Sequence, residues 1–140
     1  MNLSGLYVFL ALLAIGMLAF AWYSSRTDRR RQQEIATSRP LDTLETFVAS
    51  FRPELQPIAR AIYTQFQEFT VRGNLPFRKS DPVVKTLSID RDDLDEALLK
   101  VANQFGCRKP TKEDDSKFHS RETFEDFVEF INYLRPVAAS

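Results

Sequence analysis

The sequence predicts an all-α protein with one membrane-spanning helix at the N-terminus and a bundle of four or five helices after it. Two observations support this fold class: an uncharged apolar run from Leu3 to Tyr23, and apolar residues at helical spacing in later segments. No segment shows the apolar–polar alternation that is typical of a half-buried strand. The expected organisation is an anchor over residues 1–25, a basic linker with a short amphipathic helix over 26–53, and a helical bundle over 54–136.

The composition excludes several classes of protein. A chain of 140 residues is too short for a catalytic barrel or a doubly wound dinucleotide enzyme. The 19 basic and 19 acidic residues balance, so we expect no nucleic-acid partner, because nucleic-acid-binding domains usually carry excess positive charge. The single cysteine, Cys107, cannot form an internal disulfide, which excludes a disulfide-stapled secreted scaffold.

The apolar run has the length and flanks of a membrane anchor. A helix over residues 3–23 spans about 30 Å, which is the thickness of the hydrocarbon core of a bilayer. Trp22 and Tyr23 stand where interfacial aromatic residues belong. By the positive-inside rule, the basic residues that follow predict an N-terminus outside and a cytoplasmic remainder; they are Arg26, Arg29, Arg30 and Arg31.

A cleaved signal peptide is the alternative interpretation of this segment. Ala19-Phe20-Ala21 matches the small-x-small cleavage pattern. However, no Lys or Arg precedes the apolar run, and the run is longer than the usual apolar core of a signal peptide. We therefore expect a retained single-pass anchor in the bilayer of a bacterial inner membrane, with its helix continuing until Pro40 stops it.

The first soluble helices follow Pro40. Asp42 with Glu45 predicts a capped start to a short helix that ends before Pro53, and residues 54–70 predict a longer helix. The apolar stripe of the short helix comprises Leu41, Leu44, Phe47, Val48 and Phe51, and that of the longer one comprises Leu55, Ile58, Ile62, Phe66 and Phe69.

The remaining chain predicts a long ordered loop and three further helical segments. Residues 74–89 contain two prolines and no clean period, so we expect a loop held to the core by Phe77, Val83, Val84, Leu87 and Ile89. A helix from Asp90 to Phe105 and a short capped turn at Thr111–Asp114 follow. The last helix starts at Ser120 or Thr123 and buries Phe124, Phe127, Val128, Ile131 and Leu134, which leaves Phe130 and Tyr133 as a possible docking patch.

The start of the helix at Asp90 concentrates charge. Acidic residues in a first helical turn are stabilised by the helix dipole, and they also offer a negative surface to a basic partner. A solvated, well-capped helix start is an alternative explanation of the same pattern. A calcium-binding loop is excluded, because the residues at its glycine and ligand positions do not match. The partner-binding residues predicted here are Asp90, Arg91, Asp92, Asp93, Asp95 and Glu96, and the preceding loop carries the opposite charge on Arg72, Arg78, Lys79 and Lys85.

The order of these helices resembles that of acyl carrier proteins, over about residues 54–135. Carrier proteins show Leu-Gly-x-Asp-Ser-Leu before an acidic helix, and Leu87 and Asp90 stand at the matching positions here. The serine that carries the phosphopantetheine arm is replaced by Arg91, whose guanidinium cannot form that phosphodiester. The resemblance therefore implies a carrier-like domain that has lost its cargo, and Ser88 is a poor substitute because it lies three residues early.

These features predict a non-enzymatic adaptor or accessory subunit of a membrane protein complex, or of a membrane-associated enzyme. An atypical acyl or phosphopantetheine carrier tethered to the membrane is the alternative. We predict no catalytic residues, cofactor or metal site, because His119 and Cys107 have no companions at ligand or nucleophile spacing.

Overall fold

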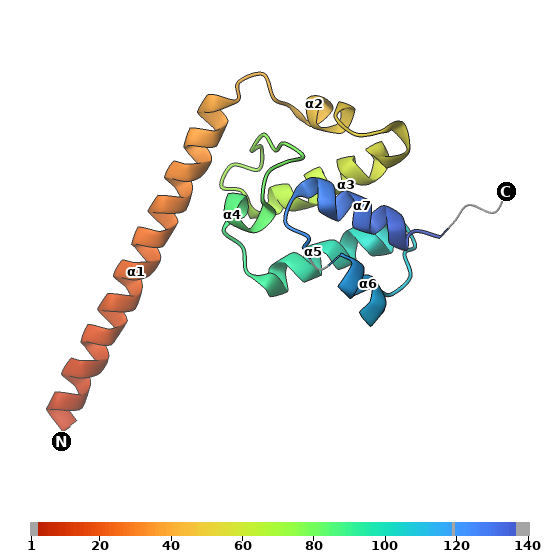
Figure 1. The fold of residues 1–140 in the computed structure, drawn as a ribbon. Helices are drawn as coiled ribbons and strands as arrows, with labels where there is room; N and C mark the ends of the chain where they lie inside the picture. The colour runs from red at the N-terminus through yellow and green to blue at the C-terminus, as the bar shows by residue number, and fades with distance from the viewer. Residues whose placement is uncertain (1–2, 119, 137–140) are drawn as a thin grey trace.

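The computed structural model describes residues 3–118 and 120–136, which contain helices but no strand. Helix α1 (Leu3–Ser38) extends far beyond a compact helical domain (Figure 1). That domain comprises α2 (Leu44–Ala49), α3 (Gln56–Phe66), α4 (Val83–Leu87), α5 (Arg91–Gln104), α6 (Lys112–Lys117) and α7 (Phe124–Leu134). The predicted all-α fold class is confirmed.

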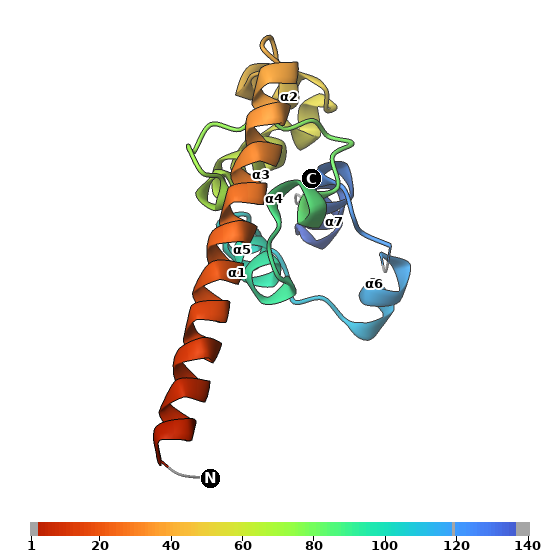
Figure 2. The same ribbon diagram turned by 90° about the vertical axis from the view of Figure 1, so that its left-hand side faces the viewer.

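Helix α1 is long and apolar enough to cross a membrane. Its apolar window has a mean hydropathy of 2.3, and none of that window is buried against the domain. The helix continues without a break to Ser38, and Pro40 follows it, as expected. In both views the N-terminal half of α1 projects away from the domain, and α5 and α6 form the end of the domain toward that half (Figures 1 and 2).

An aromatic cluster fills the core where α3 packs against α2, α5 and α7. Phe124, from the first turn of α7, is fully buried and stacks on Phe77 with ring centroids 4.5 Å apart. Its ring also meets Phe47 and Phe66 edge-on, each at 5.9 Å. Aromatic side chains contribute large buried areas and prefer these offset and T-shaped arrangements, so Phe124 joins α2, α3 and the 74–82 segment into one core.

Side-chain caps set the starts of the helices. The Asp90 carboxylate accepts the Asp93 N–H at 2.8 Å, and α6 and α7 begin with complete capping boxes on Thr111 and Thr123. Helix α2 differs from the prediction, because Thr43 rather than Asp42 is its N-cap. Asp42 instead accepts a hydrogen bond from the Arg78 side chain at 2.5 Å.

The segment expected to be a long loop contains a short helix. Helix α4 follows Pro82, whose fixed φ suits a helix N-terminus, and it ends at Ser88 in the left-handed region at φ 52°. At five residues, α4 is too short to show a helical period in the sequence. Val83 and Leu87 reach the core as predicted, whereas Val84 is exposed.

Three further expectations are corrected. The helix expected over 54–70 is narrower, because 3₁₀ turns at Pro53–Leu55 and Gln67–Phe69 flank α3. Leu41 is 84% exposed, since it precedes the start of α2 and is not on the buried face. Phe130 is buried, because Phe118 packs edge-on against its ring at 5.1 Å and Arg121 covers it. Tyr133 remains exposed.

Candidate functional site

The residues predicted to bind a partner lie at the N-terminal end of α5, where all six are exposed. Asp90 caps the helix, so its carboxylate is already engaged with backbone. The first turn of α5 also holds Asp92 and Asp93 beside the positive end of the helix dipole. This end of α5 lies toward the N-terminal half of α1 (Figure 2).

The structure distributes these residues over more than one face of α5. Arg91 and Asp95 line a groove between α5, α6 and α7. Asp93 lines a different cleft, which lies between α5 and α1. Glu96 is 3.5 Å from Lys100 of the same helix, a surface ion pair that contributes little to stability. Asp93 and Asp95 therefore border different hollows of the domain surface.

The cleft beside Asp93 joins the domain to the region of α1 that follows the apolar run. It has a volume of about 500 Å³. On α1 it is lined by Phe20, Ser24 and Asp28, and on the domain by Leu87 and Asp93. The acidic start of α5 is thus adjacent to the end of the apolar run of α1.

Ser88, the poor substitute for a carrier serine, also faces α1. Its hydroxyl accepts a hydrogen bond from the Arg31 side chain at 3.3 Å, and Arg31 also donates to the Lys85 carbonyl. Ser88 ends α4 and is separated from the first residue of α5 by Ile89 and Asp90. The position that aligns with the carrier serine, Arg91, is exposed.

The C-terminal half of α1 is attached to the domain by polar contacts. The buried Gln32 accepts the Val71 N–H at 2.8 Å through its side-chain oxygen. Arg39, beyond the helix end, forms two hydrogen bonds with Asp81 at 2.6 and 2.8 Å, and a third with the Pro76 carbonyl. We call the Ser24–Ser38 part of α1 the strut, because these contacts hold it against the domain.

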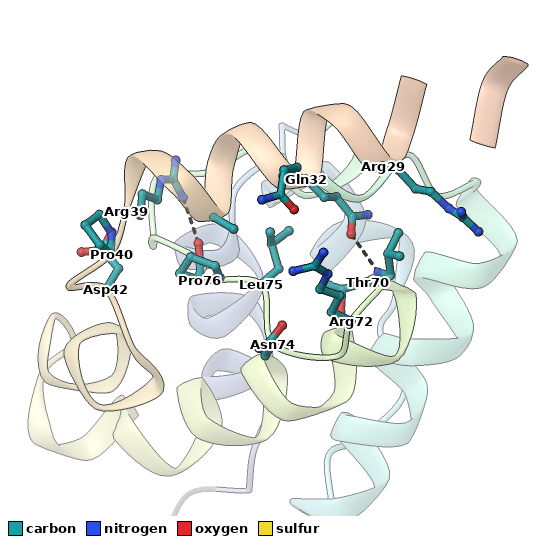
Figure 3. Close-up of a pocket in the computed structure, with 13 residues that line it drawn as sticks. Arg29, Gln32, Arg39, Pro40, Asp42, Thr70, Arg72, Asn74, Leu75 and Pro76 are labelled. Carbon is teal, nitrogen blue, oxygen red and sulfur yellow. Dashed lines mark hydrogen bonds between the residues drawn. The ribbon is translucent and has the colours of Figure 1, made fainter. Parts of the chain in front are cut away.

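A polar cleft of about 590 Å³ lies between the strut and the 70–76 loop (Figure 3). Arg29 from α1 and Arg72 from the loop line opposite walls with the Gln32 amide between them, and Asn74 lies further along the loop, beyond Arg72. Neither arginine forms an ion pair within the described residues. The sequence did not indicate this cleft, because its two walls are about 40 residues apart and neither wall shows a motif.

The basic loop is partly neutralised by contacts within the domain. Arg78 pairs with Asp42 at 2.5 Å, and the Lys79 ammonium lies 3.8 Å from Glu125. Of the four cations predicted to make this loop basic, only Arg72 and Lys85 have no ion pair within the described ranges. The charge contrast between this loop and α5 is therefore weaker than the sequence indicated.

The apolar groove between α5, α6 and α7 has a volume of about 690 Å³. At one end of the groove, the Arg108 guanidinium donates hydrogen bonds of 2.5 and 3.0 Å to the Asp114 carboxylate. This guanidinium, together with the Thr111 N–H, keeps the pKa of Asp114 far below its usual range. Sequence patterns indicated that Asp114 caps α6 but not that it also anchors the α5–α6 connection.

Residues 3–118 and 120–136 include possible metal ligands and the single thiol of the chain. No group of three or more His, Cys, Asp or Glu side chains there is placed to hold a metal ion. Burial raises the pKa of the Cys107 thiol, which makes it less reactive than a free thiol at neutral pH. His119 lies outside the described residues.

Comparison with known proteins returns no match: neither a family model, nor a curated protein, nor a solved structure is similar to this chain.

Proposed function

We propose that this chain is a non-enzymatic, membrane-anchored adaptor or accessory subunit of a membrane protein complex. Helix α1 spans the bilayer with its N-terminus outside, and the helical domain lies at the cytoplasmic face. The domain resembles an acyl carrier protein without the modifiable serine, and it docks on its partner through the acidic start of α5.

The exposure and flanks of α1 support the anchor. A helix from the core of a soluble protein would be buried, whereas the apolar residues of α1 are exposed. A cluster of arginines follows the apolar run at once, and the Arg26 guanidinium lies 5.3 Å from the Trp22 ring centroid. Such an aromatic–basic boundary is typical of the cytoplasmic end of a spanning helix.

The observation that carries the docking proposal is the cleft shared by Phe20, Ser24 and Asp93. With α1 in a bilayer, this cleft holds the acidic start of α5 near the membrane–water boundary. The cytoplasmic flanks of other spanning helices are rich in Lys and Arg at the same level. A membrane partner would therefore meet the acidic residues with opposite charge, which favours specific association.

Charge reversal tests this docking surface. The triple variant Asp92→Lys, Asp93→Lys and Asp95→Lys leaves the Asp90 cap intact. In pull-downs from native membranes, we expect it to recover at least tenfold less partner protein than the unsubstituted chain. The matched control changes the same charge elsewhere on the domain surface, through Glu54→Lys, Glu68→Lys and Glu122→Lys. Unchanged co-purification of the first variant would overturn the proposal.

Intact mass separates the adaptor from the alternative carrier. We expect the full-length, natively expressed chain to carry no added group. An addition of one phosphopantetheine, with or without an acyl group, would instead identify a membrane-tethered carrier. Loss of residues up to Ala21 would identify a cleaved signal peptide and remove the anchor.

A further inference from the structure

A second surface of the domain has the form of a binding groove. Its floor is apolar and is formed by α5 and α7, with Leu98 and Ala102 on one side and Phe127 and Ile131 on the other. The groove has a volume of about 690 Å³ and lies on the α5–α6 end of the domain. Leu99, on its rim, is 59% exposed.

The groove follows α5 over most of its length. Residues that line it run from Arg91 to Asn103, which corresponds to about 18 Å along a helix axis, or about three turns. An α-helix of similar length matches such a groove, since amphipathic helices place residues at i, i+3, i+4 and i+7 into apolar grooves of this kind.

Cations are placed along the whole rim. Arg91 stands at one end, Lys109 at the other, and Arg121 opposite α5. Asp95 and Asp115 also line the groove, and the charge of Arg108 is balanced by the buried Asp114. Apart from Arg108, three cations and two acidic side chains line the groove, which leaves a positive excess of one charge.

Arg121 has hydrogen-bonding capacity that the domain does not use. Its guanidinium lies 3.9 Å from the ring centroid of Phe130, and its Nη2 is 3.7 Å from an Asp115 carboxylate oxygen. Its Nη1 is buried and has no hydrogen-bond partner within the described part of the chain. A buried donor without an acceptor is costly, so a carboxylate from a bound ligand would be favourable here.

We propose that this groove binds an acidic amphipathic helix of a partner protein. The apolar stripe of that helix lies on the floor, and its carboxylates face Arg121 and the cations at the two ends. A single lipid molecule fits less well, because one head group cannot reach cations at both ends of a groove that follows α5 for about 18 Å. Asp92 and Asp93 of the first docking surface do not line the groove, whereas Asp95 does, so the groove is tested below with variants that leave all three residues unchanged.

A synthetic peptide serves as the probe. It has 15 residues, leucines at i, i+3, i+7 and i+11, and glutamates beside them; its analogue carries lysines in place of the glutamates. Binding to the full chain in phosphatidylcholine nanodiscs is followed by fluorescence anisotropy. We expect saturable binding of the glutamate peptide and at least tenfold weaker binding of the lysine analogue.

Substitutions locate the site. Leu99→Glu places a charge on the rim without disturbing the core, and we expect it to weaken binding at least tenfold. Leu41→Glu makes the same exchange at an exposed leucine outside the groove and leaves binding unchanged. Cys107 lines the groove, so the bound peptide also slows alkylation of its thiol.

Several results would overturn the proposal. These are an absence of saturable binding, equal binding of both peptides, or unchanged affinity in Leu99→Glu. Protection of Cys107 by phosphatidylglycerol nanodiscs without peptide would identify a lipid as the occupant instead. A dimer in sedimentation that Leu99→Glu dissociates would identify a second copy of the chain.

Discussion

At the scale of single residues, Asp81 joins three parts of the chain. Its carboxylate accepts two hydrogen bonds from Arg39 and one from the Arg78 N–H at 2.8 Å, and the side chain is 9% exposed. The hydrogen bonds that Arg39 donates to the Asp81 carboxylate, opposed in part by burial, raise the pKa of Arg39. Asp81 thereby fixes the strut to the loop before α4.

We expect Asp81→Ala to lower the free energy of unfolding by about 1.5–3 kcal/mol, because hydrogen bonds to charged groups contribute about that much. Thermal unfolding of the full chain in detergent, followed by circular dichroism, measures the loss. Glu129→Gln breaks an exposed pair with Arg52 at 3.3 Å and serves as the control, with an expected change below about 0.5 kcal/mol. Equal losses in both variants would contradict a special role for Asp81.

Cys107 supplies a prediction that depends on pH. Burial raises the pKa of its thiol, and Sγ donates to the Ile131 carbonyl at 3.5 Å. The folded chain therefore holds less thiolate than the unfolded chain at pH 8, and we expect iodoacetamide to react at least tenfold more slowly with it. Because the folded thiol pKa is the higher one, its contribution to stability is present below the unfolded pKa and is lost above the folded value.

Capping residues could be predicted from the sequence one at a time, since a cap is a local pattern. The N-caps Asp90 and Thr111 were predicted in this way, and Thr123 was one of two predicted starts of the last helix, the other being Ser120. The prediction that Asp42 caps α2 was wrong, because the long-range partner Arg78 binds its carboxylate instead. No local pattern reveals that competition.

At the scale of elements, α7 depends on one side chain in its first turn. Phe124 contacts the rings of Phe47, Phe66 and Phe77. We expect Phe124→Ala to cost about 3–5 kcal/mol of unfolding free energy, from lost burial and the cavity left behind. Phe124→Leu keeps much of the volume and should cost clearly less in the same thermal unfolding experiment. A similar cost for both would mean that the ring contacts contribute nothing beyond filled space.

Helix α6 has only six residues, so it depends on its cap and on Arg108. We expect Asp114→Asn to unfold α6 locally, with at least tenfold faster hydrogen exchange over residues 112–117 and little change in α3. Because the folded pKa of Asp114 is depressed, its stabilising effect persists above the unfolded pKa and is lost as the pH falls through the folded value. At pH 4, the amide hydrogens of α6 should therefore stay protected from exchange in the unsubstituted chain and exchange rapidly in Asp114→Asn.

Periodic sequences predicted the long elements well. The buried residues of α7, apart from Phe130, and the inner face of α5 match their apolar stripes. Helix α4 was missed because five residues give less than two turns, and its position is set by contacts elsewhere in the fold. The Val83 N–H, for example, donates to the Glu122 carbonyl at 2.8 Å.

At the scale of the whole molecule, the strut continues the spanning helix and fixes it to the domain, as the expected continuation of the helix to Pro40 allows. Gln32, Arg31 and Arg39 attach α1 to the domain at three separate places. We therefore expect one narrow distance between spin labels at Leu18 and Lys100 in nanodiscs, measured by electron double resonance on a Cys107→Ser background.

Substitution of the three attachment residues by alanine should at least double the width of that distance distribution. The control changes three exposed positions of the same helix, with Arg30→Ala, Glu34→Ala and Thr37→Ala, and keeps the width. A broad distribution in the parent chain would show that the domain is not held by the strut.

The candidate site was only partly predictable at this scale. The acidic residues at the start of α5 stand out in the composition of one short segment. The two clefts along α1 and the groove under α6 form between segments far apart in the chain, so their linings could not be assembled from local patterns. Asp93 lines a cleft beside α1, whereas Asp95 lines the groove beside α6 and α7. This division could not be predicted either, because it depends on which distant segments pack against each side of α5.

The continuity of α1 has a mechanical consequence. A strut of about 22 Å that is rigidly joined to a spanning helix acts as a lever, and a change of about 20° in helix tilt moves its far end by about 8 Å. Tilt follows the match between the apolar length of a helix and the thickness of the bilayer. The sideways position of the domain, relative to the point where α1 leaves the bilayer, would then depend on how thick the surrounding membrane is.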